Sequence, residues 1–496
     1  MKLSEKTLGG LNPDVGVPKY DRAALRPGII HIGVGNFHRS HQAVYINELL
    51  NAGGDPAWGI QGAGVRQPDV QMREMLSAQD WLFSVVEVDG DNLNASVIGG
   101  MMDFLPVDPA ANAPVIAAMT NPETKIVSLT ITEGGYFVDA STGTFNVNHP
   151  DIAADVTSPT HPKTVFGAIL AALVIRRTNG TAPFTVMSCD NLPGNGDITR
   201  DAVVTMARAI DPDLAHWVQD NVTFPNGMVD RITPATGDRE RGMLQSVFGF
   251  EDTMPVFCEP FRQWVLEDKF VNGRPALEKV GVTFTGDIHP FEKMKIRMLN
   301  GGHAIMAYPS ALLGIEFAHE AMATPLIRDF LRKVLTDDVM AFVPDVAGFT
   351  PGQYLDSICT RFANPGVADT IRRLCHDGSN RQPKFVIPSV NDNLAGGHTP
   401  YGLALSCALW CQYCAGRNDQ GDIISDNDPN WAKLHETAIQ AQTDARAWLA
   451  QDEIYGKLGN DQRFLNAFSS ALKSLGTVGT EMTIRSYLRD ANKAAG

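Results

Sequence analysis

The spacing of apolar and polar positions changes along this chain, and the change falls near residue 290. Before that point, short apolar runs end in glycine or polar residues and alternate with segments of helical spacing. Buried strands are predicted at 28–35, 58–65, 125–132 and 181–188. Helices are predicted at 37–52 and 165–177. Because strands alternate with helices, we predict an α/β fold with a Rossmann-type parallel sheet covered on both faces.

From about Glu292 onward the apolar residues recur every three or four positions, which is typical of amphipathic helices. This spacing covers 294–314, 324–343, 401–416 and 430–450. The segment 272–290 contains proline and glycine and is a candidate hinge. We therefore predict a Rossmann-type domain over 1–285 and a mostly α-helical substrate and catalytic domain over 286–496. A cleft between two such domains is a common place for an active site.

Composition narrows the classes of protein to consider. The 496 residues include 44% hydrophobic and 20% charged residues, an ordinary balance for a folded globular protein. The net charge of −15 disfavours nucleic-acid or anionic-membrane partners, which need a basic surface. The first residues lack an apolar signal core, and the longest apolar run, 166–175, is too short to cross a bilayer. We expect a cytoplasmic protein, and the acidic surface favours a monomer.

Seven cysteines, an odd and sparse number, predict reduced thiols. Three of them, Cys407, Cys411 and Cys414, have the C-x3-C-x2-C spacing of some iron–sulfur sites. The same three positions share one face of an apolar helix, where cysteine behaves as a small hydrophobic residue. We favour the buried helix and keep an iron–sulfur protein as an alternative of a different class.

The clearest sign of a cofactor is the glycine-rich turn that contains Gly33 and Gly35, between a predicted strand and a predicted helix. Such a turn lets backbone amides approach the pyrophosphate of a dinucleotide. His38 replaces the third glycine of G-x-G-x-x-G, which predicts looser packing of the helix against the sheet. Asp69 follows the second strand and favours NAD, because a carboxylate repels the 2′-phosphate of NADP. Arg66 acts in the opposite direction.

A polar set on a predicted helix points to chemistry on a hydroxyl group. On an ideal helix, Glu292, His303 and Asn300 lie about 60°, 80° and 140° from Lys295, so all four share one side. Lys and Glu usually form a solvated face, but the apolar sequence after His303 indicates a helix that is partly buried. A desolvated Lys295 would lose basicity and act as a general base near neutral or mildly alkaline pH.

Two further segments, 188–193 and 224–234, place polar residues at strand ends or between prolines. In an open α/β sheet, strand ends at the crevice are where ligands bind. For 224–234, a turn held by an Asp–Arg pair is the simpler interpretation.

The chain resembles the long-chain polyol dehydrogenases, the mannitol dehydrogenase family. The similarity lies in segments 33–41, 128–136, 188–193 and 228–234 and in the Lys295-x4-Asn300-x2-His303 set. Weaker similarity at 258–261, 264–270 and 383–385 extends it over most of the chain.

This resemblance implies a metal-independent, NAD-dependent oxidation of a polyol. The reaction that it favours is the oxidation of D-mannitol to D-fructose. Lys295 would be the base, Asn191 and Asn300 would stabilise the oxyanion, His303 would orient the substrate, and Glu292 would carry the proton out. The sugar hydroxyls would be held by Asp230, Arg373 and Arg381, the last in place of a family lysine. NAD would be held by Gly33, Gly35, Asn36, Phe37, His38, Arg66, Asp69, Thr130, Glu133 and Val229.

Three alternatives remain open beside the iron–sulfur protein. One is a uronate reductase acting on fructuronate or tagaturonate, for which Arg373 and Arg381 would form a cationic clamp. Another is an arabinitol or sorbitol dehydrogenase of the same family. The last is a cofactor-binding sensor that catalyses nothing.

Overall fold

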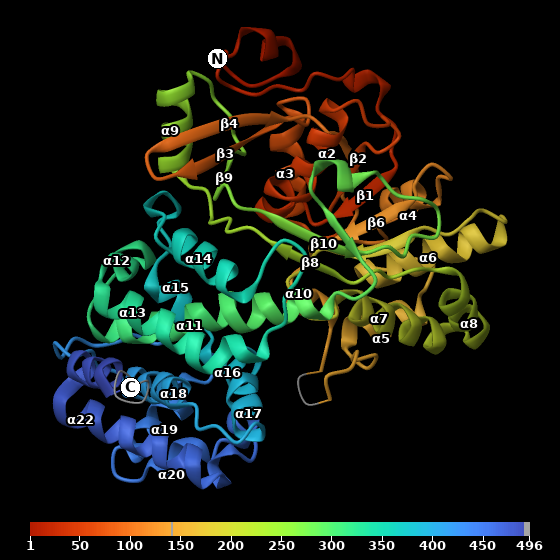
Figure 1. The fold of residues 1–496 in the computed structure, drawn as a ribbon. Helices are drawn as coiled ribbons and strands as arrows, with labels where there is room; N and C mark the ends of the chain where they lie inside the picture. The colour runs from red at the N-terminus through yellow and green to blue at the C-terminus, as the bar shows by residue number, and fades with distance from the viewer. Residues whose placement is uncertain (140–141, 491–496) are drawn as a thin grey trace. The chain divides into compact units, whose positions relative to one another are not determined.

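The computed structural model describes residues 1–139 and 142–490. The chain forms two compact units, unit 1 from Met1 to Ile288 and unit 2 from His289 to Gly496 (Figure 1). Unit 1 contains all the strands named below, and unit 2 is built from helices.

A five-stranded parallel sheet forms the centre of unit 1, with the strand order β5-β2-β1-β6-β7. Its strands are β1 (Ile29–Ile32), β2 (Ile60–Ala63), β5 (Met101–Phe104), β6 (Ile126–Leu129) and β7 (Thr185–Ser188). The chain builds outward from β1 on one side and then continues with β6 on the other side. The order of strands therefore reverses between β1 and β6, which is where ligands bind in open α/β sheets. The predicted Rossmann-type sheet is confirmed.

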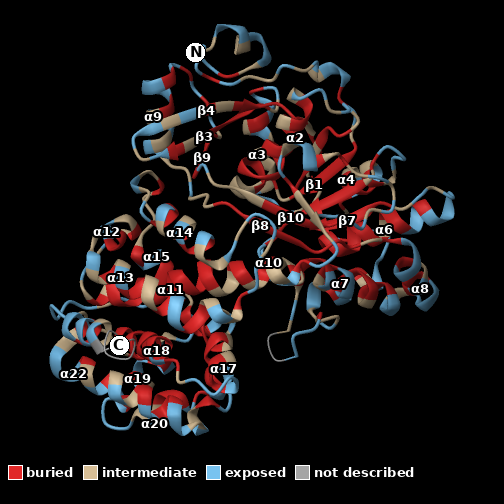
Figure 2. Ribbon diagram, viewed as in Figure 1, coloured by how far each residue is buried: buried red, intermediate tan, exposed pale blue. Residues whose placement is uncertain are grey.

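The sheet is buried on both faces because successive side chains of a strand point to opposite sides. Ile30 and Ile32 pack with α4 (Ala113–Thr120), α6 (Val165–Thr178) and α7 (Asn195–Ile210). Ile29 packs on the other face with α2 (Gln42–Asn51). Figure 2 shows buried residues along β1 and β7 and on α6. Apolar runs without alternation are what such doubly covered strands require.

Two smaller sheets were not predicted. One has the order β11-β10-β8, with β8 (Gly227–Asp230), β10 (Gln263–Glu267) and β11 (Thr283–Thr285). The other has the order β4-β3-β9, with β3 (Phe83–Asp89), β4 (Asn92–Ile98) and β9 (Val256–Cys258). The predicted hinge over 272–290 is not an open linker, since it contains β11 and the short helix η4 (Leu277–Val280).

The predicted helix over 37–52 is interrupted at one residue. His41 leaves the helical region (φ −119°, ψ −88°) and separates α1 (Asn36–Ser40) from α2. Its Nε2 lies 3.0 Å from the carbonyl oxygen of Gln263, so a contact distant in sequence accompanies the break. The remaining helices of unit 1 are η1 (Glu5–Gly10), η2 (Arg22–Ala24), α3 (Asp69–Ser77), η3 (Glu133–Tyr136), α5 (Pro150–Thr157), α8 (Pro212–Asn221) and α9 (Asp238–Phe248).

Unit 2 packs its helices around α11 (Gly301–Leu312) and α18 (Tyr401–Cys414), which are buried along most of their length (Figure 2). The other elements are α10 (His289–Met294), η5 (Lys295–Asn300), α12 (Ala318–Ala323), α13 (Pro325–Val334), η6 (Leu335–Val339), η7 (Met340–Phe342), α14 (Pro351–Phe362), η8 (Pro365–Val367), α15 (Ile371–Cys375), α16 (Gly378–Phe385), α17 (Ile387–Ala395), α19 (Trp431–Ala441), α20 (Ala445–Leu449), α21 (Asp452–Tyr455), η9 (Leu458–Asn460) and α22 (Gln462–Asp490). Within 1–139 and 142–490, no helix combines the length and apolar character needed to cross a membrane.

The three cysteines of α18 are core residues. Cys407, Cys411 and Cys414 are buried thiols. Burial raises the pKa of Cys407 to about 12 and raises the pKa of Cys411 and Cys414 well above the ordinary value. In this apolar core the three cysteines pack as small hydrophobic residues. The described residues also contain no group of three or more His, Cys, Asp or Glu side chains arranged to hold a metal ion. The buried-helix interpretation is therefore the one that the structure supports.

Unit 1 should lose stability in mild acid because three of its histidines are buried. Burial lowers the pKa of His31 and His41 to about 3 and lowers that of His38 well below the ordinary value. In the unfolded chain these groups bind protons below pH of about 6.5, while the folded protein does not. The free energy of unfolding should then fall by about 1.4 kcal/mol per pH unit for each histidine as the pH falls from about 6.5 toward 3.

Urea unfolding of unit 1, measured between pH 7.5 and 5, tests this expectation. In His41→Gln, the side-chain amide can still donate to Gln263. The slope of the unfolding free energy against pH should be shallower in this variant by the contribution of one proton. Equal slopes in the two proteins would contradict it.

Candidate active site

The glycine turn after β1 has a backbone that only glycine adopts readily. Gly33 has φ +99°, and a Cβ there would collide with the carbonyl oxygen of Thr130. The Gly35 amide donates to the Gly33 carbonyl at 2.7 Å, and α1 begins directly afterwards. A Cβ on Gly35 would meet nothing within 4 Å among the described residues, so this side of the turn is open. The turn therefore has the backbone conformation and the open space that a dinucleotide pyrophosphate needs.

His38 lies against the sheet. Its ring stacks on that of His31, with the centroids 3.5 Å apart and the planes 13° apart. His31 in turn contacts Ser128 Oγ at 2.8 Å and Thr130 Oγ1 at 2.9 Å. The looser packing expected from His38 was therefore wrong, because a flat ring pair takes the place of the third glycine. With 1% of its surface exposed, the His38 side chain is packed within unit 1.

The acid expected to contact the cofactor ribose lies at the end of the neighbouring strand. Asp69 is the first residue of α3, and its Oδ2 accepts the backbone N–H of Arg66 at 2.9 Å. Gly64 leaves the space for this carboxylate, since a Cβ there would overlap it. Arg66 is exposed. β2 pairs directly with β1, so Asp69 and the glycine turn follow adjacent strands.

Asn36 and Phe37 both have contacts within unit 1. The side-chain amide of Asn36 donates to the carbonyl of Pro234 at 3.3 Å, and its oxygen accepts from Arg39 at 2.6 Å. Phe37 stacks on His41 with the ring centroids 4.9 Å apart. These contacts hold the first turn of α1 in place.

The ends of β6 and β7 are joined by a residue that we did not predict. Asp190 follows β7 and accepts the backbone N–H groups of Ile131 at 2.8 Å and Thr132 at 3.0 Å, and the Tyr136 hydroxyl at 2.7 Å. Burial raises its pKa, and these donors act in the opposite direction. Asn191, the next residue, is exposed. The only signal in the sequence was the acid's place directly after a strand.

Two more predicted residues of unit 1 lie on β8. Val229 pairs with Trp264 of β10, and Asp230 is buried at the strand's end. Arg231 donates to Glu87 at 2.5 Å and to the carbonyls of Ser40 and Glu259. The segment is thus a strand end within a sheet, whereas the simpler interpretation was an isolated turn.

In unit 2, the predicted catalytic helix is not an ideal α-helix. η5, from Lys295 to Asn300, is π-helical, and the Gly301 amide donates to the carbonyl of Ile296, five residues earlier. In such a turn, residues five positions apart face the same side, so Asn300 lies closer to the side of Lys295 than the expected 140°. π-Helical turns often occur at functional sites. Lys295, Asn300 and His303 are only 6%, 9% and 7% exposed, and Glu292 on α10 is also buried.

His303 is a neutral ring within a group of cations. It stacks on Phe362 with the ring centroids 4.1 Å apart, and its Nε2 has no hydrogen-bond partner within the described parts of the chain. Burial lowers its pKa well below the ordinary value, and the nearby charges of Arg373, Arg381, Arg361 and Lys295 lower it further. An unprotonated imidazole with an unused nitrogen is suited to a hydrogen bond with a neutral hydroxyl group.

The two arginines predicted to contact substrate already have partners in the protein. Arg373 donates to Asp369 through Nε at 2.6 Å and through Nη2. Arg381 donates to the carbonyls of Leu374 at 2.9 Å and His376 at 3.1 Å. One positive charge is thus neutralised by a carboxylate, and the other arginine has donors committed to the backbone.

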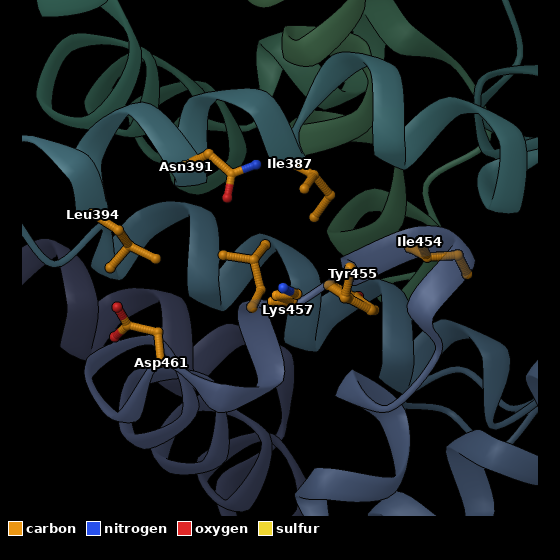
Figure 3. Close-up of a pocket in the computed structure, with 9 residues that line it drawn as sticks. Ile387, Asn391, Leu394, Ile454, Tyr455, Lys457 and Asp461 are labelled. Carbon is orange, nitrogen blue, oxygen red and sulfur yellow. The ribbon is translucent and has the colours of Figure 1, made fainter. Parts of the chain in front are cut away.

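A pocket of about 450 Å³ also lies in unit 2, between α17 and the segment that connects α21 with η9 (Figure 3). Ile387, Leu394 and Ile454 contribute apolar walls, and Lys457 and Asp461 are charged. The predicted site residues of unit 2 lie on other elements, namely η5, α10, α11, α15 and α16, and none of them is among the residues that line this pocket.

Family models match both units. The model described as Mannitol dehydrogenase Rossmann domain matches residues 27–279, and that described as Mannitol dehydrogenase C-terminal domain matches residues 287–476. The chain belongs to the mannitol dehydrogenase family. The resemblance inferred from the motifs is thereby confirmed.

Individual members of the family are similar over almost the whole chain. The mannitol 2-dehydrogenase of Cereibacter sphaeroides is 56% identical over 471 residues, covering 95% of this chain and 98% of that protein. The mannitol 2-dehydrogenase of Phaeosphaeria nodorum is 39% identical, and the match covers 98% of this chain and 86% of that protein. A solved structure, Pseudomonas fluorescens mannitol 2-dehydrogenase in a ternary complex with NAD and D-mannitol, has a TM-score of 0.87 and 42% identity, covering 99% and 100%. A D-sorbitol dehydrogenase in substrate-free form has a TM-score of 0.90 and 34% identity, covering 98% and 100%.

Proposed function

We propose that this protein is an NAD-dependent polyol dehydrogenase that oxidises D-mannitol at C2 to D-fructose and catalyses the reverse reduction with NADH. The observation that carries this proposal is the 56% identity to a mannitol 2-dehydrogenase over 95% of the chain. The solved relative with bound NAD and D-mannitol supports both the coenzyme and the substrate.

The residues of unit 1 fit NAD. Gly33 allows the backbone of the turn, Gly35 leaves open space for the pyrophosphate, and the Asp69 carboxylate lies after β2 for the ribose hydroxyls. Thr130, Glu133 and Val229, near the ends of β6 and β8, would lie toward the nicotinamide. NAD, when bound, supplies the hydride acceptor, and the chain supplies position and electrostatics.

The chemistry on the alcohol falls to unit 2 and Asn191. Lys295, buried at the start of the π-helical turn and near other cations, would take the proton of the C2 hydroxyl through its neutral amine. The side-chain amides of Asn191 and Asn300 would donate to the oxygen as negative charge develops. His303 would hold a neighbouring hydroxyl, and Glu292 would pass the proton on to solvent.

The partner of Arg373 favours a neutral substrate over a uronate. A carboxylate clamp needs an uncompensated guanidinium, but Arg373 is paired with Asp369. Arg381 donates to two backbone carbonyls through Nη1, which leaves its charge uncompensated. A paired Arg373, together with Asp230, is better suited to the hydroxyls of a polyol.

Absorbance at 340 nm tests the proposed function, with mannitol, sorbitol and arabinitol each assayed with NAD or NADP, and fructuronate assayed with NADH or NADPH. Mannitol with NAD should give the highest kcat/KM. Turnover of fructuronate without turnover of mannitol would identify a uronate reductase. A preference for sorbitol or arabinitol would retain the family reaction and change the substrate. A protein that binds NADH but turns over no polyol would be a sensor.

The charge of Asp69 should set the coenzyme preference. Asp69→Asn keeps an oxygen that accepts the Arg66 amide but removes the repulsion of a 2′-phosphate. The ratio of kcat/KM for NADP to that for NAD should rise at least about tenfold, a modest effect for a close pair of charges near a surface. Arg66→Ala, the matched control, should lower the same ratio. An unchanged ratio in Asp69→Asn would show that the carboxylate does not face the ribose.

We further propose that residues 1–285 form the NAD-binding domain and that residues 286–496 form the substrate and catalytic domain, to which Asn191 and Asp230 of the first domain add contacts. The family matches, which end at 279 and begin again at 287, support this division. All seven cysteines are unpaired, which suits a reducing cytoplasm. We expect a monomer, and its mass in solution by light scattering tests this.

A further inference from the structure

The loop after β6 has a backbone conformation that its residues do not favour. Thr132 has φ +63° and ψ 165°, a region used almost only by glycine, although threonine is β-branched. Phe137, at the other end of η3, also has a positive φ of 52°. Strain of this kind persists only where surrounding contacts hold it, and it is found most often at functional sites.

The Asp190 carboxylate supplies those contacts. It accepts the amides of Ile131 and Thr132, which lead into the strained residue, and also the Tyr136 hydroxyl. Its own backbone is held in turn, because the side-chain amide of Asn195 donates to the Asp190 carbonyl at 3.0 Å. The loop and the carboxylate therefore form one rigid group.

This group lies where the reaction is proposed to occur. β6 and β7 are adjacent and parallel, and Leu129 pairs with Ser188 at their ends, so both loops leave the same edge of the sheet. The Thr130 hydroxyl donates to the Gly33 carbonyl at 2.6 Å, which joins the same loop to the glycine turn. Asn191, one of the two proposed oxyanion donors, follows Asp190 directly.

We infer that Asp190 is a positioning residue: it holds the Thr132 loop in its strained conformation and thereby places Asn191 relative to the nicotinamide end of the NAD site. This inference rests on the proposed function. Asp190 does not touch the reacting atoms in this scheme, and its effect on the reaction passes through Asn191 and the loop.

Asp190→Asn is the most direct test. The variant keeps one oxygen but turns an NH₂ group toward a donor, so one contact is lost and Thr132 is released. We expect kcat for mannitol oxidation to fall roughly 10- to 50-fold, with kcat/KM falling equally, because the loss concerns the transition state. NADH binding, measured by fluorescence, should change less than about threefold.

A second carboxylate provides a matched control. Asp155 is also buried and also accepts two amides and one hydroxyl: Lys163 N–H at 2.8 Å, Thr164 N–H at 2.8 Å and Thr164 Oγ1 at 2.6 Å. It holds the start of α6. Asp155→Asn should lower the thermal midpoint about as much as Asp190→Asn but leave kcat unchanged. Equal losses of kcat in the two variants would show that Asp190 is an ordinary structural residue and would overturn the inference.

Rescue separates strain from simple loss of a contact. Glycine adopts positive φ without steric cost, so Thr132→Gly should have wild-type kcat and should restore at least about fivefold of the lost kcat in the Asp190→Asn background. Absence of rescue would overturn the inference. If Asp190→Asn does not fold, Tyr136→Phe provides a second test, because it removes the hydroxyl contacts with Asp190 and Ser188 and leaves the carboxylate in place. It should lower kcat about three- to tenfold, and an unchanged kcat would overturn the inference.

The wild-type protein in the same assay distinguishes the two proposals. If it oxidises mannitol and Asp190→Asn does so equally well, the positioning role fails and the proposed function stands. If the wild-type protein binds NADH but oxidises no polyol, the proposed function fails, and the inference fails with it.

Discussion

Lys295→Met is expected to lower kcat for mannitol oxidation by about 10²–10⁴-fold, the usual contribution of a general base. Methionine retains most of the length and apolar contacts of the lysine stem, so the variant should fold. The physical reason is the position of the amine at the start of the π-helical turn, buried and near the cations around His303. Burial of an amine disfavours its charged form, and the proposed mechanism uses the neutral amine as the proton acceptor.

The pH dependence and a neighbouring lysine make this prediction specific. Oxidation needs the unprotonated base, so kcat/KM of the wild-type protein should rise with pH through the titration of Lys295. That limb should vanish in Lys295→Met. Lys293, on α10, is the control, because its amine is partly exposed and lies 3.7 Å from Asp392. Lys293→Met should keep normal turnover, and normal turnover in Lys295→Met would reject the mechanism.

The central sheet could be predicted because its signal is local. Four of its five strands appear as apolar runs because they are covered on both faces, and the helices between them have their own period. The edge strand β5 was not predicted, since it is short and Met102 and Asp103 are only partly buried. The strands of the two small sheets lack this signal. β8 lies in a short polar segment between prolines, and it pairs with β10, some 35 residues later. Such pairing depends on contacts that are distant in sequence.

The details of the site depended on partners that are distant in sequence. His38 would leave a gap only if nothing stacked on it, and its partner His31 lies on the strand before the turn. The π-helical turn has the same apolar spacing as an α-helix. What distinguishes it is the hydrogen bond from the Gly301 amide to the Ile296 carbonyl, five residues earlier, which that spacing does not reveal. Asp190 likewise has its donors on another loop.

One relevant contact was visible in the sequence. Asp369 and Arg373 are four residues apart, the spacing at which an acid and a base meet on a helix. The structure places this pair at the start of α15. We nevertheless did not predict this ion pair, and the spacing alone did not establish it, because Asp369 lies just before α15 and not on the helix.

Removal of either proposed oxyanion donor should have the second largest effect. Asn191→Ala and Asn300→Ala should each lower kcat by about 10²–10³-fold, as expected for the loss of one preorganised donor. Binding of NADH should change little, because the amides act on the alcohol oxygen. Asn391→Ala is the control in unit 2, since this asparagine is exposed at the pocket of Figure 3.

The double variant tests whether both amides act on one oxygen. Groups that stabilise the same charge are coupled, so the loss in Asn191→Ala/Asn300→Ala should be smaller than the product of the two single losses. Losses that multiply in full would mean that the amides serve different atoms. Asn300→Asp, which places a carboxylate where a donor is needed, should be slower than Asn300→Ala, because a negative charge then faces the developing alkoxide. If Asn300→Asp were the faster variant, position 300 would not face that oxygen at all.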